Sequence, residues 1–186
     1  MSVTGDQMRA RNLRMVGALA ALFFLPVLAS FWMYYFTDWR PAGSTAHGTL
    51  IQPPVPLQNA DVFKDKWTLL YVADGGCDAA CLHALYIARQ TRLLLNKDIQ
   101  RVNRVLVATG PVDRALFDRE HAGVTVLDAS APAADSLLQA IPADQRANGL
   151  FIIDPLANLV MRYDARENPK GLLDDLKKLL KLSHIG

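Results

Sequence analysis

The chain has 186 residues, of which 51% are hydrophobic and 20% are charged, and its net charge is +2. This length allows one domain of ordinary size with an appendage. Basic and acidic residues are equal in number beyond residue 40, and no P-loop, GxGxxG or HExxH pattern occurs. With no basic stripe and no such motif, the sequence predicts no nucleic-acid binding and favours none of the common nucleotide or zinc-protease sites.

An uncharged run from Met15 to Phe36 is the most hydrophobic part of the chain. At about 1.5 Å per residue it is long enough to cross a hydrocarbon core of about 30 Å. Pro26 is tolerated in a membrane helix, and aromatic residues gather near the far end, where they suit the interface. The run continues well past the small-residue cleavage site at 27–29, so we interpret it as an uncleaved anchor rather than a signal peptide.

The flanking charges predict the orientation of this anchor. Arg9, Arg11 and Arg14 precede the run, whereas Arg40 is the only basic residue between Phe36 and Lys64. The positive-inside rule therefore predicts a cytoplasmic tail at 1–14, a transmembrane helix at 15–36 and an exported remainder. Residues 37–60 are rich in proline and glycine and predict an extended tether. Residues 61–186 are then expected to form an exported domain.

Strand and helix patterns alternate through this domain. Apolar runs predict strands at 69–72, 102–108 and 124–127, and helical periodicity predicts helices at 77–97, 111–120, 133–141 and 171–182. Residues 150–154 and 159–163 flank a Pro-Leu-Ala-Asn turn, which predicts a β-hairpin. Strands joined through helices run parallel, and the hairpin supplies an antiparallel edge. The expected class is α/β, with a thioredoxin-like fold and one N-terminal transmembrane helix.

Cys77 and Cys81 are the only cysteines, and a helix that contains both places their sulfurs on one face. The pair can be a structural disulfide, a redox-active dithiol or a metal-binding dithiol. A staple that closes so short a loop contributes only about 2 kcal/mol. A helix N-terminus lowers the pKa of Cys77, although Asp78 opposes that effect. We expect Cys77 to attack and Cys81 to resolve, and Asp74 either relays a proton or is only a turn residue.

Three segments resemble the Sco/SenC family of membrane-anchored thioredoxin-fold proteins. They are Lys-Trp-Thr-Leu-Leu-Tyr at 66–71, the Cys77-x-x-x-Cys81 spacing, and Leu-Phe-Ile-Ile-Asp-Pro at 150–155. The CxxxC spacing is the most specific of the three, since thioredoxin-type oxidoreductases usually have CxxC. The resemblance implies a role in assembly of the copper centre of cytochrome c oxidase, with Cys77 and Cys81 as copper ligands.

The chain departs from the pattern of that family at two places. Leu82 follows the second cysteine where the family has proline, and residues 143–149 lack the histidine that completes the copper site. Two thiolates alone can hold Cu(I), whereas Cu(II) also wants imidazole. His83 is expected to point away from the thiols, and His47, His121 and His184 lie in a tether, a connection and the C-terminal tail. Pro142 is too far upstream of Leu150 to act as the proline that thioredoxin-like reductases place against their cysteines.

These observations predict a periplasmic dithiol protein of Sco type, anchored in the bacterial inner membrane. It would pass Cu(I) or reduce copper-ligand cysteines of a partner, which is either a cytochrome c oxidase subunit or another copper-assembly factor. We expect an assembly factor more than a turnover enzyme. Two alternatives remain: a thioredoxin-fold scaffold with a fixed disulfide, and a general periplasmic thiol-disulfide exchanger.

Overall fold

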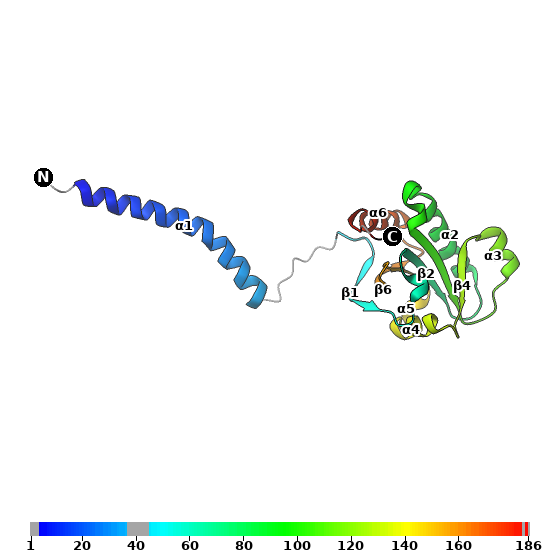
Figure 1. The fold of residues 1–186 in the computed structure, drawn as a ribbon. Coiled ribbons are helices and arrows are strands. Elements are labelled where there is room, and N and C mark those ends of the chain that lie inside the picture. The colour runs from blue at the N-terminus through cyan, green and yellow to red at the C-terminus, as the bar shows by residue number, and fades with distance from the viewer. Residues whose placement is uncertain (1–3, 37–44, 184, 186) are drawn as a thin grey trace. The chain divides into compact units, whose positions relative to one another are not determined.

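A computed structural model describes residues 4–36, 45–183 and 185. The chain divides into two units, Met1–Ser44 and Thr45–Gly186 (Figure 1). The first unit holds one long helix, α1 (Thr4–Phe36), with Pro26 inside it. Its segment Arg11–Phe36 is long and apolar enough to cross a membrane, and none of that segment is buried in the protein. The helix begins inside the predicted 1–14 tail, and the predicted tether residues 37–44 lie outside the described residues.

The second unit is built on one mixed sheet in the order β1-β6-β5-β2-β3-β4. Strands β2, β3 and β4 run parallel, and β5, β6 and β1 extend the sheet through antiparallel pairs. The predicted parallel strands and C-terminal hairpin are therefore present. The strands are β1 (Thr49–Pro56), β2 (Trp67–Ala73), β3 (Val102–Ala108), β4 (Val124–Asp128), β5 (Gly149–Ile153) and β6 (Asn158–Asp164).

Strand β1 is the main departure from the expected fold. It lies within the segment predicted to be a tether, yet it pairs with β6, and Leu57 and Ala60 beyond it are buried. The domain therefore begins before residue 61, and β1 rather than the hairpin forms this edge. Its prolines are compatible with an edge strand, because only one side of such a strand needs its N–H groups for pairing. The pairing register shifts between Leu50 and Val55, where Pro53 and Pro54 lie.

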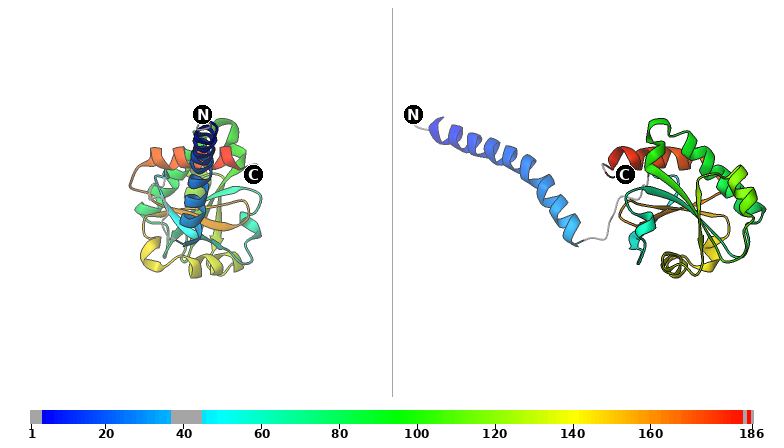
Figure 2. Two further views of the ribbon diagram at one scale, coloured as in Figure 1. Left: turned by 90° about the vertical axis from the view of Figure 1, so that its left-hand side faces the viewer. Right: turned by 45° about the vertical axis from the view of Figure 1, so that its right-hand side comes forward.

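Helices cover both faces of the sheet (Figure 2). On one face, α2 (Ala79–Leu93) and α6 (Pro169–Leu182) pack against alternate strand residues such as Leu69 and Tyr71. On the other face, α4 (Pro132–Ala140) packs against the intervening residues, including Leu70 and Val72. The remaining helical segments are α3 (Arg114–Glu120), α5 (Ala143–Arg146) and two 3₁₀ turns, η1 (Asp61–Phe63) and η2 (Asn96–Arg101).

The chain enters this domain at a buried carboxylate. Asp175 of α6 is 4% exposed, and its Oδ2 accepts hydrogen bonds from the backbone N–H groups of His47 and Gly48 at 2.6 and 3.1 Å. The Tyr163 hydroxyl donates to the same oxygen. Burial, reinforced by this bond, raises the pKa of Tyr163. These contacts attach the segment before β1 to α6, which explains why part of the predicted tether belongs to the folded domain.

Candidate functional site

The cysteine segment follows β2, a fully buried strand of the sheet. Every residue of β2 is buried, because the strand pairs on both sides and is covered on both faces. The chain then turns at Gly75, whose φ of +101° is readily available only to glycine. Gly110 donates its N–H to the Gly75 carbonyl at 2.9 Å, and a Cβ on Gly110 would lie 2.7 Å from the Gly75 carbonyl carbon. The loops after β2 and β3 are therefore in direct backbone contact.

Cys77 and Cys81 form a disulfide in this structure, with their Cα atoms 5.2 Å apart. The predicted helix at 77–97 is wrong at its start, because α2 begins at Ala79 and Cys77 precedes it. Cys81 is 0% exposed, whereas Cys77 is half-buried. The two sulfurs are therefore inequivalent: approach from solvent meets Cys77 first. Their assignment as attacking and resolving residues stays a prediction.

Asp78 determines where α2 begins. Its Oδ1 accepts a hydrogen bond from the Cys81 N–H at 2.9 Å, and its carbonyl accepts one from the Leu82 N–H at 2.9 Å. A carboxylate in this position satisfies an otherwise unpaired donor at the helix N-terminus and interacts well with the helix dipole. Residue 77 is thereby excluded from the helix, and a negative charge stands next to the half-buried cysteine.

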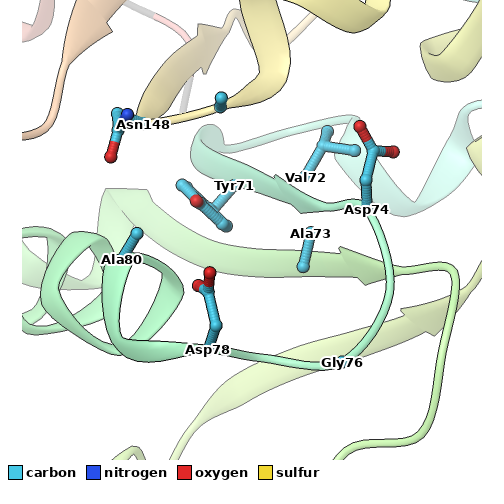
Figure 3. Close-up of a pocket in the computed structure, with 9 residues that line it drawn as sticks. Tyr71, Val72, Ala73, Asp74, Gly76, Asp78, Ala80 and Asn148 are labelled. Carbon is cyan, nitrogen blue, oxygen red and sulfur yellow. The ribbon is translucent and has the colours of Figure 1, made fainter.

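A cavity of about 230 Å³ opens on one side of this loop (Figure 3). The side chains of Tyr71 and Asp78 point into the space facing Asn148. Tyr71 is 4% exposed, and burial raises the pKa of its phenol, with the nearby Asp78 charge acting in the same direction. The lining residues are Tyr71, Val72, Ala73, Asp74, Gly76, Asp78, Ala80, Ala147 and Asn148.

Arg146 of α5 connects this region to the opposite face of the sheet. Its Nη1 lies 3.2 Å from Asp74 Oδ1, and its other nitrogens donate to the Ile141 carbonyl at 3.0 Å and the Leu138 carbonyl at 2.6 Å. Asp74 therefore has an ion-pair partner, which the sequence did not reveal. No local pattern could have indicated it, because the two residues lie 72 positions apart. Pro142 precedes α5, and the residues that reach the cavity are Ala147 and Asn148.

The three histidines in the described part of the chain do not complete a metal site. His83 is exposed on α2, and His47 is exposed before β1. His121 is 6% exposed and packs against Phe117, with ring centroids 5.5 Å apart. His184 lies outside the described residues. Met161 is buried in the core.

The cysteine, histidine and acidic side chains determine which state of copper the protein could bind. No group of three His, Cys, Asp or Glu side chains is placed to hold a metal among the described residues. The reduced thiolates of Cys77 and Cys81 alone fit two-coordinate Cu(I), because thiolate is a soft ligand. The donor set does not fit a Cu(II) site that requires imidazole. Cu(I) is therefore the only copper state that these side chains accommodate, and only after the disulfide is reduced.

Comparison with known proteins supports the fold. Residues 67–183 match the family model described as "Transmembrane-like, thioredoxin-like, C-terminal domain". The structure of yeast Sco1 with copper bound has a TM-score of 0.52 and 11% identity, over 76% of this chain and 96% of that chain. At that identity the likeness concerns the fold, and it confirms the predicted thioredoxin-like architecture and the resemblance to Sco proteins at that level.

Two further solved structures carry Sco names. Arabidopsis thaliana ScoI with copper bound is 15% identical with a TM-score of 0.47, over 74% of this chain and 100% of that chain. A SCO1/SenC family lipoprotein from Bacillus anthracis is 11% identical with a TM-score of 0.46, over 71% and 94%. No curated protein sequence matches the chain significantly.

Proposed function

Because this chain belongs to the family of transmembrane-like, thioredoxin-like C-terminal domains, we propose that it is a membrane-anchored dithiol protein of Sco type. Its reduced Cys77 and Cys81 would reduce a disulfide between copper-ligand cysteines of a partner during cytochrome c oxidase assembly. The observation that carries this proposal is the inequivalence of the two sulfurs, one half-buried and one fully buried, at the start of α2. Exchange needs an attacking thiol that a partner can reach and a second thiol close enough to resolve the mixed disulfide.

The exchange proceeds in two balanced steps. The Cys77 thiolate attacks one sulfur of the partner disulfide, which forms a mixed disulfide and releases the partner's other sulfur as a thiolate that takes up a proton. The Cys81 thiolate then attacks the Cys77 sulfur, which forms the Cys77–Cys81 disulfide and releases the second partner thiolate. Two electrons pass to the partner, and a separate dithiol donor returns the protein to its reduced form.

Transfer of Cu(I) is the second candidate function. It is favoured by the adjacency of two sulfurs whose Cα atoms are 5.2 Å apart. A Cu(I) ion held by two thiolates, with no third ligand among the described residues, is open to attack by further thiolates of a recipient. In this reaction copper is a cargo rather than a resident cofactor.

The proposed location is the bacterial inner membrane, with the domain in the periplasm. The apolar helix α1 supports anchoring, and the arginines that precede the apolar run support a cytoplasmic N-terminus. A periplasmic cysteine pair is oxidised by default, so reductive exchange requires a dedicated dithiol donor. The proposed partner is a cytochrome c oxidase subunit or another copper-assembly factor.

Two measurements on the full chain in detergent separate these functions. Incubation of the reduced protein with a disulfide peptide should oxidise Cys77 and Cys81 and release two peptide thiols per chain. The Cys81→Ser variant should accumulate the mixed disulfide, whereas Cys77→Ser should form none. Cu(I) titration of the reduced protein against a chromogenic chelator should show whether one Cu(I) binds per chain in a thiol-dependent manner.

The outcomes are distinct. Thiol release without stoichiometric Cu(I) binding supports reductive exchange, and Cu(I) binding that Cys77→Ser abolishes supports transfer. If the Cys77–Cys81 disulfide resists reduction by excess dithiothreitol, or if neither activity is detected, the pair is a structural staple and the dithiol function is wrong.

A further inference from the structure

The cavity beside the cysteine loop has no part in the exchange chemistry itself. Gly76 and Asp78 both line it, and they are the chain neighbours of Cys77. The wall of the cavity therefore lies within one residue of Cys77 along the chain. The volume of about 230 Å³ suits one long side chain rather than a folded segment.

The walls of the cavity present polar groups from three separate parts of the fold. Tyr71 comes from β2, Asp78 from the start of α2, and Asn148 from the loop before β5 (Figure 3). The phenol of Tyr71 stays protonated, since burial raises its pKa, and so adds no charge. The cavity is therefore a hydrogen-bonding site whose charge is set by its carboxylates.

Only one of its two carboxylates lacks a counter-ion. Asp74 is paired with Arg146 at 3.2 Å. Asp78 takes part in no ion pair within the described part of the chain, and its N-cap hydrogen bond uses Oδ1. No lysine, arginine or histidine is among the lining residues. The cavity thus presents one negative charge without a counter-ion, fixed in place by the helix cap.

We propose that this cavity binds a basic side chain that the partner segment carries next to its reacting cysteine. The ammonium or guanidinium group would donate a hydrogen bond to the Asp78 carboxylate. Tyr71 and Asn148 would contact the same polar end of the side chain. This inference rests on the proposed exchange function and adds its substrate class: a disulfide flanked by lysine or arginine. An acidic residue at that position would be repelled by Asp78.

Rates of mixed-disulfide formation test this assignment. The reduced full chain in detergent is mixed at low salt with three synthetic disulfide peptides that differ only in the residue beside cysteine: lysine, glutamine or glutamate. We expect the lysine peptide to react fastest and the glutamate peptide slowest, with about a tenfold difference between them. The difference should shrink in about 1 M salt, because screening weakens an interaction at a solvent-open site.

Asp78→Asn is the informative variant, since asparagine also caps a helix and only the charge is lost. It should change the rates of all peptides by a common factor and remove the lysine-to-glutamate difference. Asp113→Asn is the matched control: Asp113 caps α3 through the Leu116 N–H at 3.0 Å and does not line the cavity. That variant should keep the wild-type preference.

The results separate the inference from the function on which it rests. Exchange with no preference among the three peptides, or a preference that survives in Asp78→Asn, overturns the cavity assignment while the exchange function stands. No exchange with any peptide removes both. A preference lost equally in Asp78→Asn and Asp113→Asn also contradicts the assignment, because a general charge effect would then explain it.

Discussion

At the scale of single residues, two buried basic side chains, Arg104 and His121, lie near each other at the C-terminal end of α3. Arg104 is 5% exposed and donates Nη2 to the Ala122 carbonyl at 2.6 Å, while its Nε and Nη1 find no hydrogen-bond partner among the described residues. Burial, together with repulsion from Arg92 and Arg89, lowers the pKa of Arg104 to about 10. The adjacent His121 is 6% exposed, and its Nδ1 likewise has no partner there.

His121 should make the stability of the domain sensitive to acid. Burial, reinforced by Arg104, lowers the pKa of His121 below its ordinary value of 6.5. The unfolded state therefore binds a proton more readily, and the free energy of unfolding falls as the pH drops below about 6.5, by at most about 1.4 kcal/mol per pH unit. Above that pH the His121 side chain is neutral in both the folded and the unfolded state, and the effect on stability vanishes.

His121→Phe should weaken this pH dependence, because phenylalanine keeps ring packing against Phe117 but does not titrate. The measurement is urea unfolding of the detergent-solubilised chain at pH 7.5 and 5.5, followed by tryptophan fluorescence. His83→Phe alters an exposed histidine on α2 and should leave the wild-type difference unchanged. An equal difference in wild type and His121→Phe would contradict the assignment.

At the scale of elements, the position of the cysteine loop depends on its contact with the loop after β3. Thr109 accepts the Gly75 N–H through its hydroxyl, and Gly110 donates to the Gly75 carbonyl. Because β2 and β3 are parallel neighbours, the loops that follow them lie side by side at the C-terminal ends of these strands. The position of the disulfide loop is thus fixed by β2, which precedes it, and by the loop after β3, which is hydrogen-bonded to it.

Gly110→Ala should disturb this support. The new Cβ would lie 2.7 Å from the Gly75 carbonyl carbon and 2.9 Å from the Gly76 nitrogen, and backbone atoms cannot move aside as a flexible side chain does. We expect a loss of about 1–3 kcal/mol in the free energy of unfolding, as for other overpacked sites. We also expect faster reduction of the Cys77–Cys81 disulfide by dithiothreitol. An unchanged free energy of unfolding together with an unchanged rate of disulfide reduction would contradict a supporting role for this loop contact.

At the scale of the whole molecule, the folded domain begins close to the membrane anchor in sequence. The first described residues of the domain are Thr45 and Ala46, and the helix of the anchor ends at Phe36. The attachment of residues 47 and 48 to Asp175 makes these residues part of the folded domain, so that the segment between helix and domain is shorter in sequence than the predicted 37–60 tether.

The orientation of the anchor should depend on Arg9, Arg11 and Arg14. Alkaline phosphatase fused to the C-terminus should be active in the wild-type chain, because the enzyme folds only after export. Changing the three arginines to glutamate should lower that activity several-fold, since the positive-inside rule predicts that these charges keep the N-terminus in the cytoplasm. Changing Lys170, Lys177 and Lys181, exposed on α6, to glutamate is the matched control and should have no such effect. Equal activity in all three fusions would contradict the predicted orientation.

The sequence by itself determined the elements whose signals are local. The apolar run of β2, the alternation of strands and helices, the turn of the β5–β6 hairpin and the membrane-length helix were all readable, because each depends on the periodicity or composition of one continuous segment. The spacing of Cys77 and Cys81 likewise predicted that they can be joined, since four positions of chain keep them close in nearly any compact conformation.

Only the tertiary structure decided the features that depend on distant partners. The composition of residues 49–56 predicts a tether, and only the pairing with β6 shows that they form a strand. Arg146 reaches Asp74 only because α5 lies near the C-terminal end of β2. The burial of His121 and the unequal exposure of the two cysteines follow from packing. A contact between residues far apart in the chain leaves no periodic signal in either segment, so it becomes visible only when the fold brings both together.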